Sequence, residues 1–179
     1  MTKLEQLLSQ YAAYHLDRKN IYTHFIGIPM IVVSLICLMA RAEFTVAGLP
    51  ITLALIVMTL SVLYYLKLDL VFGGLMALLL ALVYPFALWT ASLGLSVWLT
   101  TSIGLFVVGW IFQFVGHFYE KKKPAFVDDL VGLIIGPLFV LAEWVFLLGF
   151  RKSLEEKMLI EARRLRADMD SKELQTASS

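Results

Sequence analysis

The three histidines of this 179-residue chain are the residues best suited to chemistry, and each stands within four residues of a carboxylate or an amide. His15 and His24 lie in the stretch YHLDRKNIYTHFIGIP, and His117 lies in WIFQFVGHFYEKKKP. Neutral imidazole suits a divalent metal such as iron or zinc. The single cysteine, Cys37, allows neither a disulfide within the chain nor a thiolate cluster. A metal site here must therefore use nitrogen and oxygen ligands.

His15 and His24 can meet only if the chain bends between them. On one continuous helix, their separation of nine residues would leave the two side chains about half a turn out of alignment. We expect the break at DRKN, residues 17–20, with Asn20 as the N-cap of the helix that follows. Asn20 and His24 are four residues apart and would share one face of that helix.

The third histidine belongs to a polar stripe near the end of an apolar helix. Gln113, His117 and Glu120 are spaced i, i+4 and i+7, so they lie on one helix face. Three imidazoles with one or two carboxylates suit a divalent first-row metal such as iron or zinc, and iron left with open positions would bind O₂ and a chelating substrate. The candidate metal ligands are therefore His15, His24, His117, Glu120 and Asp69, and the first four are the candidate catalytic residues.

Four further residues are candidates for supporting roles. Asn20 and Gln113 could orient the ligands through hydrogen bonds. Arg18 and Lys121 could attract the carboxylate of an acid. Each candidate in these sets also has a plainer interpretation: a histidine can hydrogen-bond at a membrane interface, Asp69 and Asn20 can cap helices, and Glu120 can pair with the lysines that follow it.

The elements that must position these residues are those of a membrane protein. The chain is 60% hydrophobic and 16% charged, with a mean hydropathy of +0.81, whereas soluble domains are about half apolar and about a quarter charged. The formal net charge of +1 and the absence of a basic stripe exclude a nucleic-acid partner and favour contact with membrane lipid.

The hydrophobic runs predict an all-α, polytopic membrane helical bundle with four spans. A fifth run, residues 126–150, carries Gly136-Pro137 in its middle and Glu143 beyond. A full fifth span would send the arginines of the C-terminal segment to the outside, against the positive-inside rule. We therefore expect a broken or re-entrant hydrophobic hairpin there and both termini in the cytoplasm. The four predicted spans are residues 21–40, 49–66, 70–89 and 95–118.

Amphipathic surface helices are predicted at both termini. Thr2 and Glu5 have the spacing of a capping box at the start of the first helix. Residues 1–150 are expected to form a single catalytic membrane domain, and residues 151–179 an amphipathic helix followed by a disordered tail, QTASS. With both termini inside, His15, His24, Asp69, His117 and Glu120 all reach the same membrane face.

The chain resembles a known membrane family. The motifs are His15-x4-Asn20-x3-His24-x2-Gly27-x-Pro29 and Gly116-His117-x2-Glu120-x3-Pro124-Ala125, supported by YYLKLD and IGPLFVLAEWVF. They are similar, in order and spacing, to a family that includes the fungal 2-hydroxy fatty acid dioxygenase of phytosphingosine breakdown and its bacterial relatives.

The resemblance implies an Fe²⁺ enzyme that uses O₂, without 2-oxoglutarate, to shorten a 2-hydroxy fatty acid by one carbon. It implies histidine ligands at His15, His24 and His117. Its membrane would be the cytoplasmic membrane of a bacterium or the endoplasmic reticulum of a fungus. The natural acid, its acyl length, the fourth ligand and a homo-oligomeric state are left open.

Two other functions are compatible with the same residues. One is a haem-binding electron-transfer bundle with His24 and His117 as axial ligands. The other is a non-enzymatic lipid-binding protein whose polar residues only stabilise helix ends. A di-iron hydroxylase is disfavoured, because by resemblance such enzymes use about eight histidines, well above the three here.

Overall fold

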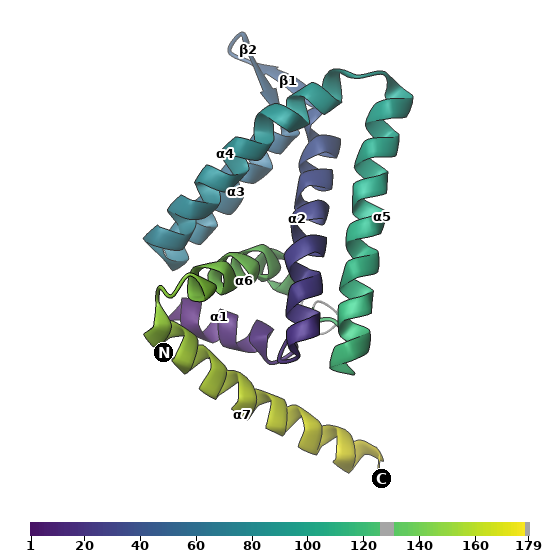
Figure 1. Ribbon diagram of the computed structural model, residues 1–179. Helices are drawn as coiled ribbons and strands as arrows, with labels where there is room; N and C mark the ends of the chain where they lie inside the picture. Colours follow the sequence, from purple (N-terminus) through teal and green to yellow (C-terminus); the bar gives the residue numbers. More distant parts are fainter. Residues whose placement is uncertain (126–130, 178–179) are drawn as a thin grey trace. The chain divides into compact units, whose positions relative to one another are not determined.

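The computed structural model describes residues 1–125 and 131–177, which contain seven α-helices and one antiparallel β-hairpin. The chain divides into two compact units. Unit 1 comprises Met1–Tyr22 and Phe114–Ser179, and unit 2 comprises Thr23–Gln113. Helix α2 (Arg18–Ala40) crosses the first boundary and helix α5 (Leu95–Glu120) the second, each as one uninterrupted helix (Figure 1).

Unit 1 is built around α1 (Lys3–Ala12), which packs against α6 (Val131–Leu147) and α7 (Lys152–Ala177). The predicted capping box is confirmed. The Thr2 hydroxyl accepts from the N–H of Glu5, and the Glu5 carboxylate accepts from the N–H of Thr2. Helix α7 buries Met158 and Ala162 completely. It continues into the QTASS segment as far as Ala177, where the sequence predicts disorder, and residues 178–179 lie outside the described part.

Unit 2 contains a hairpin that the sequence analysis missed. Strands β1 (Glu43–Val46) and β2 (Leu49–Thr52) pair antiparallel, with Val46 opposite Leu49. The two residues between them, Ala47 and Gly48, have φ angles of 51° and 81°, as a two-residue type I′ turn requires. The predicted span 49–66 is therefore wrong at its start, since its first four residues are strand.

Helices α3 (Leu53–Leu68) and α4 (Leu70–Ser92) lie side by side as the predicted tight helical hairpin (Figure 1). Asp69 forms the turn, and its Oδ1 accepts from the N–H groups of Val71 and Phe72. Gly73 allows the close approach, because a Cβ there would lie 2.6 Å from the backbone of Leu66. The chain direction therefore reverses between α3 and α4 at residues 67–69, KLD.

Three of the described helices are long and apolar enough to cross a membrane, namely α2, α4 and α5. Helices α3 and α6 are apolar but shorter. Of the two predicted alternatives, the break is wrong at Gly136-Pro137: α6 continues through Pro137, which costs it the hydrogen bond to the carbonyl four residues earlier. The re-entrant course of the segment stays a prediction. The first five residues of the predicted re-entrant segment, 126–130, lie outside the described part.

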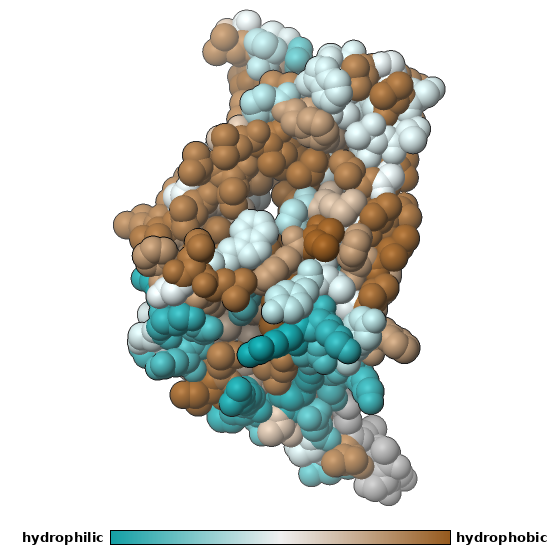
Figure 2. Space-filling view, viewed as in Figure 1, coloured by the Kyte–Doolittle hydropathy of each residue, from teal (hydrophilic) through white to brown (hydrophobic). Residues whose placement is uncertain are grey.

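The surface of unit 2 fits contact with lipid. Figure 2 shows hydrophobic side chains over the visible face of α3 and α4. Large apolar side chains on these helices are widely exposed, among them Leu60 at 62%, Leu78 at 58% and Leu82 at 68%. A continuous apolar surface of this kind is expected to contact a membrane or another protein.

Candidate metal centre

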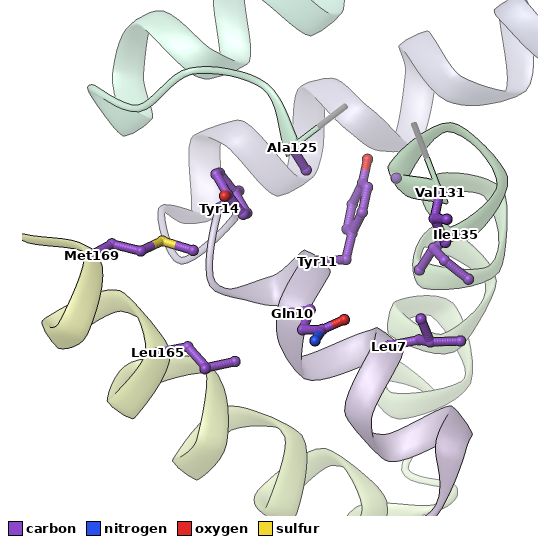
Figure 3. A pocket seen from close by; sticks show the side chains of 10 residues that line it. Leu7, Gln10, Tyr11, Tyr14, Ala125, Val131, Ile135, Leu165 and Met169 are labelled. Atoms are coloured by element: carbon purple, nitrogen blue, oxygen red, sulfur yellow. The ribbon is translucent and has the colours of Figure 1, made fainter. Parts of the chain in front are cut away.

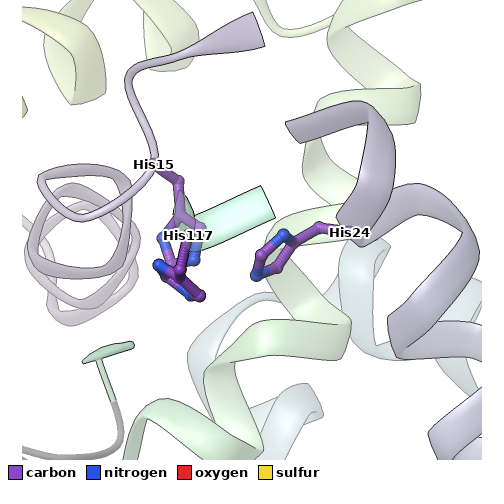
Figure 4. A group of neighbouring side chains, drawn as sticks. All are labelled: His15, His24 and His117. Atoms are coloured by element: carbon purple, nitrogen blue, oxygen red, sulfur yellow. The ribbon is translucent and has the colours of Figure 1, made fainter. Parts of the chain in front are cut away.

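The three histidines are buried and close together. Their candidate ligand nitrogens all lie within 4.8 Å of one another, and Figure 4 shows the three rings gathered around one point. His15 is 2% exposed, His24 1% and His117 7%. The ring centroids of His15 and His117 are 5.0 Å apart in an edge-to-face arrangement. The sequence prediction that these three side chains converge is met by the geometry.

The bend that turns His15 toward the others lies earlier than the sequence indicates. Helix α1 ends at Ala12, whose carbonyl accepts from the N–H of His15 at 2.8 Å. Helix α2 begins at Arg18, and Asp17 caps it, since its Oδ1 accepts from the N–H of Lys19 at 2.7 Å. The N-cap assigned to Asn20 is therefore wrong. Asp17 provides an equally good cap three residues earlier.

A hydrogen bond sets the tautomer of His15. Its Nδ1 lies 2.7 Å from the carbonyl oxygen of Tyr11, one helical turn earlier. A carbonyl can only accept, so Nδ1 carries the proton and Nε2 is the nitrogen that can bind a metal. The ring of Tyr11 stacks on that of His15, and Phe139 of α6 packs against both. The histidine and carboxylate motifs give no sign of this role for Tyr11.

A close contact between α2 and α5 lies inside unit 2, one turn after His24. A Cβ on Gly27 would lie 2.4 Å from Gln113 Nε2 and 2.7 Å from the carbonyl oxygen of Gly109. The two helices can approach this closely only because both crossing positions are glycine. His24 precedes Gly27 by one turn and His117 follows Gln113 by one turn, each on the same uninterrupted helix.

Glu120 lies in a buried hydrogen-bond network. Its side chain is 2% exposed and accepts from the N–H groups of Leu16 at 3.2 Å and Asp17 at 2.8 Å. It also accepts from Asn20 Nδ2 at 3.1 Å and forms an ion pair with Arg166. Its carboxylate is not part of the group of three histidines.

The remaining candidates lie in different surroundings. Asp69 is the cap of α4 described above and is likewise outside the histidine group. Gln113 is 5% exposed, and its side-chain amide packs directly against Gly27. Arg18 and Lys121 are exposed. The structure thus brings Asn20, Gln113 and Glu120 into buried contacts on the helices that carry the histidines, and leaves the two cations in solvent.

Arg166, whose side chain is 13% exposed, is not among the candidates that the sequence predicts. It donates to the carbonyl oxygen of Ala13 at 3.1 Å as well as to Glu120. No motif marks it, because it is one of five cations on α7 between residues 152 and 166. The one available signal is its position next to the apolar Leu165 in the predicted amphipathic C-terminal helix.

An apolar cavity of about 310 Å³ lies next to Tyr11 in unit 1 (Figure 3). Burial raises the pKa of the Tyr11 phenol, so it stays protonated at neutral pH and can donate a hydrogen bond. The cavity lies within the size range of small-molecule pockets. Its lining comes from α1, α6, α7 and the segment after α1, and includes Leu7, Gln10, Tyr14, Ile135, Leu165 and Met169.

In comparisons with known proteins, the chain is similar to 2-hydroxy-palmitic acid dioxygenases. A family model described as 2-hydroxy-palmitic acid dioxygenase Mpo1-like matches residues 1–148. The chain is 36% identical over 169 residues to the 2-hydroxy-palmitic acid dioxygenase MPO1 of Saccharomyces cerevisiae. That alignment covers 91% of this chain and 94% of the yeast protein. No solved structure matches the chain.

Proposed function

The chain belongs to the Mpo1-like family, and from that membership we propose that it is an Fe²⁺-dependent dioxygenase that shortens a 2-hydroxy fatty acid by one carbon. The observation that supports a metal is the group of three buried imidazoles, whose ligand nitrogens lie within 4.8 Å of one another. The family and activity expected from the two histidine motifs agree with these comparisons.

The donor set fits a ferrous ion. His15, His24 and His117 would hold it through neutral imidazole nitrogens, and the Tyr11 carbonyl already fixes His15 in the tautomer that binding requires. Bound there, ferrous iron would supply O₂ activation and open positions for the carboxylate and 2-hydroxyl of the substrate. Asn20 and Glu120 hold the loop that carries His15, and Gln113 packs one turn from His117.

The overall reaction balances without another co-substrate. One 2-hydroxy acid and one O₂ give the acid one carbon shorter, one CO₂ and one water. The C1–C2 bond breaks, C2 is oxidised from an alcohol to a carboxylic acid, and C1 leaves as CO₂. These two carbons together lose the four electrons that O₂ takes up. The protein contributes by holding C1 and C2 in the reacting geometry, which lowers the entropic part of the barrier.

The acyl chain would occupy the cavity beside Tyr11. That cavity is lined mainly by apolar side chains, and one of its walls, Tyr11, is the residue that stacks on His15. A tail bound there would keep its polar end on the histidine side of Tyr11. Burial of methylene groups favours such binding by about 0.8 kcal/mol each.

We further propose that both termini face the cytoplasm, as the distribution of cations indicates. Arg18 and Lys121 are exposed and would attract the acid before it enters the site. In unit 2, the apolar faces of α3 and α4 would contact lipid.

The test is metal analysis of protein purified without chelator, followed by incubation with 2-hydroxypalmitate under O₂ and mass measurement of the product. We expect about one iron per chain, as one set of three imidazoles implies, and an odd-chain acid one carbon shorter that forms only with O₂. Purified protein that retains lipid but binds no iron and turns over no acid would instead support the lipid-binding function.

Haem binding is disfavoured by the same geometry. A porphyrin between His24 and His117 would occupy the space in which the ligand nitrogen of His15 lies, within 4.8 Å of the other two. A Soret band in the purified protein would restore the haem interpretation.

A further inference from the structure

We infer that Arg166 of α7 is a positioning residue for the metal centre, which it serves by holding Glu120 and, through Glu120, the loop that carries His15. Arg166 lies beyond residue 148, where the family match ends. The inference rests on the proposed function, because it takes His15 to be a metal ligand.

Arg166 joins two segments that the histidines depend on. Its Nε donates to the carbonyl oxygen of Ala13, at the end of α1, at 3.1 Å. Its Nη2 donates to Glu120, the last residue of α5. Both side chains are removed from solvent, with 13% of Arg166 and 2% of Glu120 exposed. The planar guanidinium can make both contacts at once, which a single ammonium group cannot do with the same geometry.

Glu120 in turn holds the loop between α1 and α2, which carries His15. Its two carboxylate oxygens accept from the consecutive backbone N–H groups of Leu16 and Asp17, which directly follow His15. On the other side of the loop, the Tyr11 carbonyl accepts from the ring of His15. The backbone after His15 and the ring of His15 are therefore held independently, and the first of these restraints depends on a charged Glu120.

Loss of Arg166 would leave a buried carboxylate with neutral donors only. A buried charge without its partner is strongly unfavourable, so Glu120 would turn toward water. That movement weakens its hydrogen bonds to Leu16 and Asp17 and lets His15 move. Substitution of such outer partners typically lowers metal affinity 10–100-fold.

Helix α7 has other attachments that would survive this change. Lys122 pairs with Asp170 at 2.7 Å, and Lys157 pairs with Glu5 at 3.3 Å. Met158 and Ala162 are completely buried. The effect of changing Arg166 should therefore be local to the His15 loop.

The experiment compares full-length wild type with Arg166→Gln, Arg166→Lys and Arg164→Gln. Arg164 is the matched control, because it is an exposed arginine on the same helix that pairs with Glu161. The affinity for Co²⁺ and its visible absorption spectrum are measured, and thermal unfolding of each metal-free protein is followed by circular dichroism. His15→Ala provides the reference spectrum for a centre without that ligand.

We expect Arg166→Gln to bind Co²⁺ about 10–100-fold more weakly, with a spectrum that shifts toward that of His15→Ala. Arg166→Lys should recover part of the loss, and Arg164→Gln should match wild type. Equal affinity and an equal spectrum for Arg166→Gln and wild type would overturn the inference. A wild type that binds no Co²⁺ would instead refute the proposed metal centre itself.

A second variant covers the case in which Arg166→Gln fails to fold. The double variant Glu120→Gln, Arg166→Met removes both charges, so that no unpaired charge is left buried. It lacks the charged carboxylate that holds the His15 loop and should also bind Co²⁺ more weakly. Wild-type affinity in this variant would show that the Arg166–Glu120 pair does not position His15.

Discussion

The ring of Tyr11 lies parallel to the ring of His15, with centroids 4.2 Å apart and an interplanar angle of 6°. The backbone carbonyl of the same tyrosine accepts from His15 Nδ1. One residue therefore fixes both the orientation and the tautomer of a proposed metal ligand, the first by its side chain and the second by its main chain. The two contributions can be separated by mutation.

Tyr11→Leu should weaken metal binding by about 0.5–1.5 kcal/mol, the value of one aromatic stack, whereas Tyr11→Phe should leave it nearly unchanged. Both variants retain the carbonyl, and only leucine removes the aromatic face. Isothermal titration of the metal-free protein with Co²⁺ measures the difference. Equal affinities in the two variants would show that stacking does not orient His15.

His117→Ala should reduce bound iron to near zero and abolish O₂-dependent consumption of the 2-hydroxy acid, because it removes one of three imidazole ligands. His24→Ala should do the same. Phe118→Ala is the control, since its side chain adjoins His117 but is 79% exposed. Elemental analysis of all three proteins provides the measurement, and retention of iron in both histidine variants would contradict the site.

Gly27→Ala should lower the stability by about 1–3 kcal/mol, the usual cost of forced overpacking. The new Cβ would lie 2.7 Å from the backbone oxygen of Gly109, which cannot move aside as a side chain can. Gly104→Ala on α5 is the control, because a Cβ there meets nothing within 4 Å. Thermal unfolding in detergent compares the two. A Gly27 variant as stable as the Gly104 variant would mean that α2 and α5 do not pack through this contact.

Leu165→Trp should reduce activity toward long 2-hydroxy acids about tenfold relative to short ones, since a few lost methylene contacts account for such a ratio. Leu165 lines the cavity beside Tyr11, and the larger ring would fill it. Leu174→Trp, on the same helix but 72% exposed, is the matched control. The ratio of kcat/KM for two acyl lengths is measured. An unchanged ratio would place the acyl chain elsewhere.

Local spacing predicted much of this architecture. The meeting of His15 and His24 followed from a required bend, and the capping box at Thr2 and Glu5 was visible in four residues. The N-cap of α2 was predicted at Asn20 but is Asp17, three residues earlier. Both residue types are suitable caps, and only the tertiary contact of Asn20 with Glu120 distinguishes them.

Other features depended on contacts that spacing does not reveal. The segment that begins at Leu49 merges with an apolar run, which hid strand β2, and the positive φ angles of Ala47 and Gly48 were visible only in the structure. Arg166 and Glu120 are 46 residues apart, and the bond from Arg166 to Ala13 spans 153 residues. Periodicity along one helix carries no information about either partner.

The bond between Arg166 and Ala13 also imposes an order of assembly. A ribosome that has made His15, His24 and His117 has not yet made the arginine that closes the loop around the first of them. The nascent protein can begin to insert its long apolar helices while the backbone after His15 still lacks the restraint that Arg166 provides through Glu120. On the inference above, a chain cut short before residue 166 would reach the membrane with a centre that binds its ion about 10–100-fold more weakly.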